Sequence, residues 1–112
     1  MQNTLVRPNV AVIRPQGHIN ASNAVEFQGQ LTAAVSSPDQ SIVLVDMAQV
    51  EFLDSAGLMA FVSAHRLAHS LGRRFSLSSV SPSIRMIFEL AQLDGVFEIF
   101  ESPAALEANI GV

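Results

Sequence analysis

The residues best placed to do chemistry are Asp54 and Ser55, where a loop-like segment meets a segment with helical periodicity. The first turn of a helix exposes unpaired N–H groups and the positive end of the helix dipole, so a phosphate group is stabilised there. A serine hydroxyl at this point can accept a phosphoryl group, which adds about −1.5 to −2 charge at pH 7. The same residue types also serve as plain helix N-caps. On these residues alone, a modification site and a simple cap remain equally open.

Enzymatic interpretations of the same residues are weaker. A hydrolase triad of Ser55, Asp54 and either His65 or His69 lacks the Gly-x-Ser-x-Gly elbow, and Asp54 flanks the serine instead of orienting a histidine. His65 and His69 have the i, i+4 spacing that can bind a metal ion on one helix face. Because no acidic third ligand accompanies them, a solvated face or a partner surface is favoured. We therefore expect a protein with no catalytic residues, no metal and no cofactor.

Charge and composition exclude several other classes of function. The chain has 112 residues, ten acidic against six basic side chains and a net charge of −4, so it lacks the clustered positive charge of nucleic-acid-binding proteins. The one basic doublet, Arg73-Arg74, is explained equally well by a helix C-terminus. The absence of cysteine excludes disulfides and thiolate metal sites. No apolar stretch reaches the ~18 residues of a membrane span, and the polar N-terminus lacks a signal-peptide pattern, so we expect a cytoplasmic protein with no direct membrane insertion.

The elements that position Asp54 and Ser55 follow an alternating order. A chain of 112 residues predicts a single domain over 1–112. Short strands are expected at the following segments: Leu5–Arg7 and Val10–Arg14 (a hairpin about Pro8-Asn9), Ile42–Val45, Phe75–Val80 and Val96–Phe100. The uninterrupted apolar run of Ile42–Val45 indicates a strand covered on both faces. Asp46–Asp54 is interpreted as mostly loop, anchored on the core by Val50, Phe52 and Leu53.

Four helices are expected between and after these strands. The apolar face of the first consists of Ala24, Phe27, Leu31, Ala34 and Val35. The second, from Leu58 to Leu71, ends at Gly72 in a left-handed cap. The third begins at Ser81-Pro82 and is broken by Asp94-Gly95, and the fourth begins at Ser102-Pro103. The order β-β-α-β-α-β-α-β-α requires crossover connections. The predicted fold is therefore α/β, a mixed and largely parallel sheet of four to five strands with about four helices.

The segment Val50–Leu58, which reads VEFLDSAGL and follows the strand at Ile42, resembles the signature of STAS domains. It is most similar to bacterial anti-sigma-factor antagonists of the sporulation and stress-response type. Further similarity covers nearly the whole chain: Gly17, the strand Phe75–Val80, and the segment Ile84–Phe97.

This resemblance implies a phosphorylation switch. In that family the serine of the motif is phosphorylated by a serine kinase that is also an anti-sigma factor, and a PP2C-type phosphatase reverses the reaction. Ser55 is then the phosphoacceptor, and the unphosphorylated protein binds the kinase and releases the sigma factor. The implied partner-binding residues are Asn20, Asp54, Ser55, Ala56, Gly57 and Leu58.

One departure and one alternative accompany the resemblance. Members of this type often carry an acidic residue where this chain has Asn20, which can hydrogen-bond or cap a helix but brings no charge. STAS domains also occur as interaction subunits of membrane transport or lipid-transport complexes, in which the motif serine is only structural. That constitutive role is the alternative function.

Overall fold

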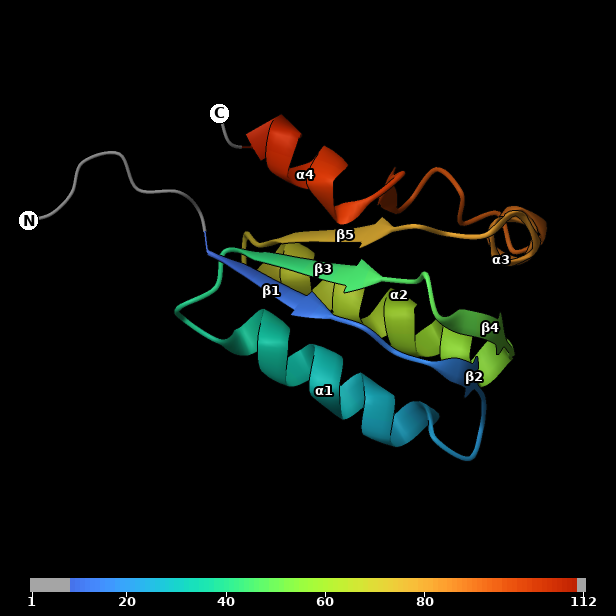
Figure 1. Cartoon of the computed structure of the whole chain (residues 1–112). Helices are drawn as coiled ribbons and strands as arrows, with labels where there is room; N and C mark the ends of the chain where they lie inside the picture. Colours follow the sequence, from blue (N-terminus) through green and yellow to red (C-terminus); the bar gives the residue numbers. More distant parts are fainter. Residues whose placement is uncertain (1–8, 111–112) are drawn as a thin grey trace, which may run out of the picture.

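Residues 9–110 are described by a computed structural model of the chain (Figure 1). Its elements, in chain order, are β1 (Val10–Ile13), β2 (Gly17–Ile19), α1 (Ala24–Ser36), β3 (Ile42–Asp46), β4 (Val50–Leu53), α2 (Ser55–Ser70), β5 (Arg74–Ser78), α3 (Pro82–Leu90), β6 (Glu98–Phe100) and α4 (Pro103–Ile110). The predicted α/β fold with four helices is confirmed. None of the described helices has both the length and the apolar character that crossing a membrane requires.

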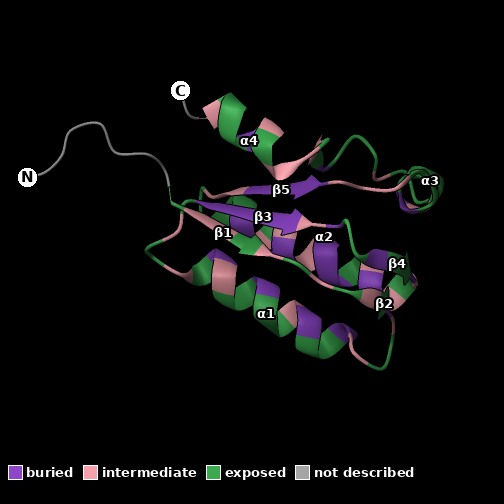
Figure 2. Cartoon of the chain, viewed as in Figure 1, coloured by how far each residue is buried: buried purple, intermediate pink, exposed green. Residues whose placement is uncertain are grey.

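The strands form a parallel four-stranded sheet in the order β1-β3-β5-β6 and a separate parallel pair, β2-β4. Successive side chains of β3 point to opposite faces, as strand geometry requires. Val43 and Val45 belong to the main core formed with α1, α2 and α3, whereas Ile42 and Leu44 pack with Leu106 of α4. The expectation of a strand buried on both faces is therefore confirmed, and Figure 2 shows β3 as buried over most of its length.

Two expectations about the strands need correction. Asp46–Asp54 is not mostly loop, because Val50–Leu53 forms β4 and pairs with β2. Gly17–Ile19 forms a second strand, β2, that was not expected; Gly17 begins it with φ of +72°, a left-handed backbone that glycine adopts most readily. The strand expected at Leu5–Arg7, and hence the hairpin, lies outside the described residues. The described order is therefore β-β-α-β-β-α-β-α-β-α.

The helix ends are formed largely as their sequences predict. Gly72 has φ of +70°, and the Arg73 N–H donates to the Ala68 carbonyl at 2.8 Å, which is the left-handed cap expected after α2. The Ser81 hydroxyl accepts from the Ile84 N–H at 3.2 Å at the start of α3. Helix α3 ends at Leu90, before the break expected at Asp94-Gly95.

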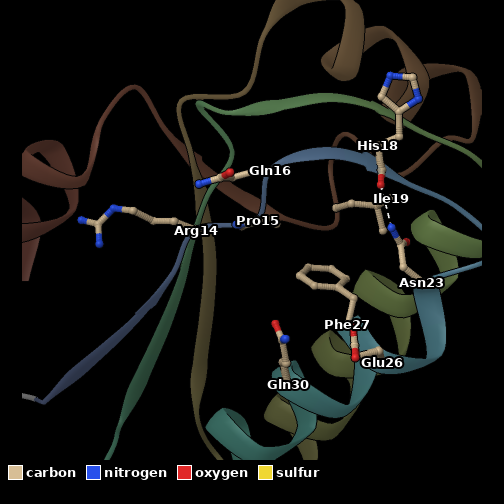
Figure 3. Close-up of a pocket in the computed structure, with 9 residues that line it drawn as sticks. All are labelled: Arg14, Pro15, Gln16, His18, Ile19, Asn23, Glu26, Phe27 and Gln30. Carbon is tan, nitrogen blue, oxygen red and sulfur yellow. Dashed lines mark hydrogen bonds between the residues drawn. The ribbon is translucent and has the colours of Figure 1, made fainter.

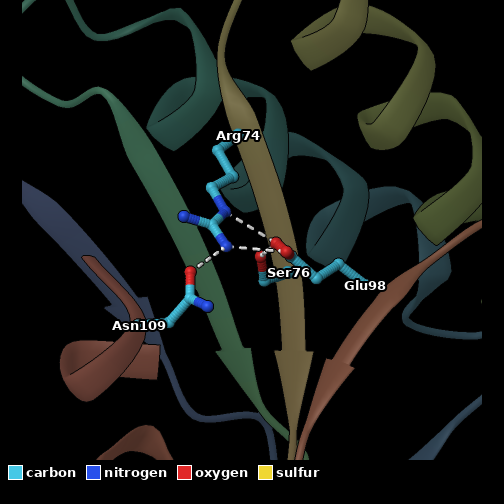
Figure 4. Close-up of polar contacts among 4 residues, drawn as sticks. All are labelled: Arg74, Ser76, Glu98 and Asn109. Carbon is cyan, nitrogen blue, oxygen red and sulfur yellow. Dashed lines mark hydrogen bonds and ion pairs between the residues drawn. The ribbon is translucent and has the colours of Figure 1, made fainter. Parts of the chain in front are cut away.

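The two arginines of the basic doublet have separate structural roles. One guanidinium nitrogen of Arg73 donates to the backbone carbonyls of Val35, Ser37 and Gln40, at and beyond the end of α1. The guanidinium of Arg74 binds both carboxylate oxygens of Glu98, at 2.7 and 2.6 Å, and the side-chain oxygen of Asn109 (Figure 4). Arg73 therefore binds carbonyls at the C-terminal end of α1, and Arg74 links β5 to β6 and α4.

Candidate functional site

The start of α2 is fixed by Asp54, which is its N-cap. Asp54 has extended backbone geometry, and its Oδ1 accepts a hydrogen bond from the Gly57 N–H at 3.0 Å. The Leu58 N–H donates to the Asp54 carbonyl at 2.8 Å and begins the helical ladder. Of the two candidate caps in the sequence, Asp54 therefore has the capping role. Ser55 is the first helical residue and is exposed.

Asp54 also joins α2 to the turn between β2 and α1. Its Oδ2 accepts from the Ala21 N–H at 3.2 Å, and its own N–H donates to the Ile19 carbonyl at 3.1 Å. These bonds bring Asn20 and Ala21, more than thirty positions away in the sequence, beside the start of α2. The implied partner residues on the two segments therefore lie on one surface.

Gly57 allows this close approach of α2 to β2. A β-carbon at position 57 would stand 2.6 Å from the Ile19 carbonyl oxygen, which is too close for any side chain. Gly57 is buried, whereas its neighbours Ala56 and Leu58 are half-buried. The glycine of the motif thus has a packing role that holds Ser55 in place.

Asn20 shapes the turn that precedes α1. Its Oδ1 accepts from both the N–H and the hydroxyl of Ser22, at 2.9 and 2.6 Å, and its own N–H donates to Oδ1 of Asn23. A carboxylate at position 20 could accept the same two bonds. The asparagine therefore preserves the turn and removes one negative charge from the surface beside Asp54.

An apolar groove of about 340 Å³ lies on the other side of Ser55, between the start of α2 and α3. Its lining residues are Phe52, Leu53, Asp54, Ser55, Leu58, Ile87, Leu90 and Ala91. Phe52, which we expected to anchor a loop on the core, is instead 48% exposed, and its ring lies at the groove beside His18. Leu90 is 80% exposed.

The sequence alone did not indicate a groove on α3. Its apolar positions Ile84, Ile87, Phe88 and Ala91 predict one core-facing side of the helix, and Leu90 lies outside that side. The available signal was Leu90 itself, because a large apolar residue outside the core-facing side adds a second apolar surface to the helix.

A second, polar pocket of about 260 Å³ lies between α1 and the segment that joins β1 to β2 (Figure 3). Asn23 donates from its side-chain amide to the His18 carbonyl at the rim of this pocket. Arg14 points away from the pocket, and its guanidinium lies 3.4 Å from the Asp46 carboxylate. None of the residues that the motif implicates lines this pocket.

The two histidines of α2 lie far from Ser55. His65 is roughly 15 Å further along the same helix, since each residue adds 1.5 Å. Its ring is half-buried and meets those of Phe75 and Phe97, with ring centroids 6.3 and 5.2 Å apart. Burial lowers the pKa of His65, and the nearby His69 lowers it further. His65 therefore packs in an aromatic cluster and cannot act as a base for Ser55.

The chain is similar over most of its length to proteins that contain a STAS domain. A family model described as STAS domain matches residues 2–106. BtrV of Bordetella bronchiseptica, a candidate anti-sigma factor antagonist, is 26% identical over 93 residues, which are 83% of this chain and 79% of BtrV.

Solved structures share the fold at lower identity. A candidate anti-sigma factor antagonist of Thermotoga maritima has a TM-score of 0.83 and 20% identity, covering 90% of this chain and 86% of that protein. A sulfate transporter family protein of Wolinella succinogenes has a TM-score of 0.79 and 18% identity, covering 94% of this chain and 88% of that protein. At these identities the likeness shows the common fold alone.

Proposed function

Because the chain belongs to the STAS domain family, we propose that it is an anti-sigma-factor antagonist controlled by phosphorylation of Ser55. Unphosphorylated, it binds a serine-kinase anti-sigma factor in the cytoplasm and thereby releases a sigma factor. Phosphorylation of Ser55 by that kinase ends the binding, and a PP2C-type phosphatase restores it. The chain itself catalyses no reaction in this cycle.

The proposal rests mainly on the different structural roles of Asp54 and Ser55. Asp54 caps α2 and ties it to the turn before α1, while Ser55 is exposed at the first helical position. Modification of the serine hydroxyl therefore leaves the capping bonds intact. This arrangement supports a modification site in preference to a serine that is only structural.

A phosphate on Ser55 is compatible with the fold. It would lie at the positive end of the α2 dipole, where an exposed anion is stabilised by roughly 0.3–1 kcal/mol. At an interface the same charge must lose its hydration, and the partner surface that binds the unphosphorylated serine has no charge to compensate it. Unbalancing one buried charge at an interface commonly costs about 2–5 kcal/mol. The free energy of unfolding and the binding affinity should therefore respond differently to phosphorylation.

Three other serines, Ser22, Ser63 and Ser81, are less suited to modification. The Ser22 hydroxyl donates to Asn20, and the Ser81 hydroxyl accepts the capping bond from Ile84. Ser63 is half-buried within α2. Phosphorylation of Ser22 or Ser81 would thus disturb a local hydrogen bond, which phosphorylation of Ser55 does not.

The test is phosphorylation by the purified cognate kinase with ATP, followed by peptide mapping. We expect phosphate on Ser55 and none on the Ser55→Ala variant, whereas Ser81→Ala should be labelled like wild type. Label that persists in Ser55→Ala would overturn the proposal. Capture of a permease subunit equally by wild type and Ser55→Ala would instead support the constitutive transport-complex role.

A further inference from the structure

Ser55 separates two surfaces of opposite character. On one side lie the polar groups of the turn before α1, with Asn20 and the Asp54 carboxylate bound to its backbone. On the other side is the apolar groove, whose walls come from β4, α2 and α3. Two large apolar side chains of the groove are substantially exposed, Phe52 at 48% and Leu90 at 80%.

A kinase that acts on Ser55 comes against the edge of the groove, because Ser55 is itself part of the groove wall. A specific protein interface buries about 800 Å² on each partner, far more than the surface of one serine. Such interfaces are commonly dominated by a few large side chains that fill desolvated pockets near the centre. A groove of about 340 Å³ has room for such an anchoring side chain.

We propose that this groove, formed by Phe52, Leu58, Ile87 and Leu90, receives an apolar side chain of the serine kinase that phosphorylates Ser55. This inference rests on the proposed function and adds an interface component outside the sequence motif, contributed by α3. The occupant is a kinase side chain next to the active site, because the groove and the phosphoacceptor lie together. A phosphate on Ser55 would then place negative charge beside this apolar contact and weaken it.

The experiment is a titration of the cognate kinase with wild type and with Leu90→Gln, Phe52→Gln and Val25→Gln, each checked by a thermal melt. Val25 is the matched control, because it is 84% exposed on α1 and undergoes a similar apolar-to-polar change away from the groove. We expect Leu90→Gln to raise Kd at least about tenfold, as loss of an interface anchor does. Phe52→Gln should raise Kd similarly, and Val25→Gln should leave Kd unchanged.

The outcomes separate this inference from the function on which it rests. If the kinase labels Ser55 of wild type but binds Leu90→Gln and Phe52→Gln as tightly, the groove proposal is wrong and the proposed function stands. If the kinase neither binds nor labels wild type, both are wrong. An equal loss with Val25→Gln, or a change in the oligomeric state of free Leu90→Gln, also contradicts the groove proposal. The second result would indicate that another copy of the chain fills the groove.

Discussion

The carbonyl oxygen of Ile19 faces the α-carbon of Gly57 so closely that a β-carbon there would stand only 2.6 Å away. The contact joins β2 to the first turn of α2, immediately beside the exposed Ser55. The position of Ser55, the proposed phosphoacceptor, therefore depends on a backbone contact that leaves no room for a side chain at position 57.

Gly57→Ala should consequently lower the free energy of unfolding by about 1–3 kcal/mol, the usual range for overpacking a well-packed contact. Gly29→Ala is the matched control, because Gly29 lies within α1 and a β-carbon there meets nothing within 4 Å. That change should stabilise the protein by roughly 0.5–1 kcal/mol, since alanine is the better helix former. Urea unfolding of both variants measures the two effects. If Gly57→Ala stabilised the protein as Gly29→Ala is expected to, the close contact at Gly57 would be contradicted.

Arg73→Ala should destabilise the protein, because it leaves three carbonyls near the end of α1 without their charged donor. Hydrogen bonds to a charged group contribute about 1.5–3 kcal/mol, so we expect a loss on the order of 2 kcal/mol in urea unfolding. Arg66→Ala removes an exposed arginine of α2 and should change the free energy of unfolding by less than about 0.5 kcal/mol. Equal effects of the two substitutions would show that the hydrogen bonds of Arg73 at the end of α1 do not stabilise the fold.

Acidification should weaken the fold through His65. Its pKa in the folded protein is lowered from 6.5 by burial and by His69, so between the two values the unfolded chain binds more protons. The free energy of unfolding should therefore fall as the pH falls from 7 through 6.5 toward the lowered pKa. Glu98, whose pKa is lowered by its hydrogen bond to Arg74, contributes a separate loss that begins near pH 4.5.

Urea unfolding at several pH values between 7 and 5.5 tests the contribution of His65. The pH dependence in this range should be weaker in His65→Gln than in wild type, whatever the change in stability at pH 7. An unchanged pH dependence would mean that another group is responsible.

The sequence predicted the four helices and the central strands because periodicity and end signals agree there. The serine cap and proline at Ser81-Pro82, the glycine at Gly72 and the apolar run from Ile42 each mark an element by local chemistry. Strand β4 was missed because its four residues, Val50–Leu53, are too few to show an alternating pattern, and the apolar Phe52 is exposed where alternation would bury it.

The candidate site could be predicted only in part. The segment from Asp54 to Leu58 is continuous, and its position at a helix start follows from residue types alone. Its neighbours are brought there by tertiary structure: Ala21 through the second Asp54 oxygen, and Leu90 through the packing of α3 beside β4. No local pattern carries such contacts, because they depend on how the β2-β4 pair and α3 are placed.

We expect phosphate on Ser55 to control partner binding without unfolding the protein. The comparison requires the unphosphorylated protein, the phosphoprotein, Ser55→Asp and Ser55→Ala. Ser55→Ala should bind like wild type because it adds no charge, and Asp54 still caps the helix. Ser55→Asp has one charge and two oxygens, so it should weaken binding in the same direction but less than phosphate does.

The most direct measurement is a titration of the cognate kinase with the phosphoprotein and with the unphosphorylated protein, beside thermal melts of both. Phosphorylation should raise Kd by about 30-fold to several thousand-fold, the equivalent of about 2–5 kcal/mol, with little change in Tm. A phosphoprotein that binds the kinase as tightly as the unphosphorylated form, or that melts far earlier, would contradict this expectation.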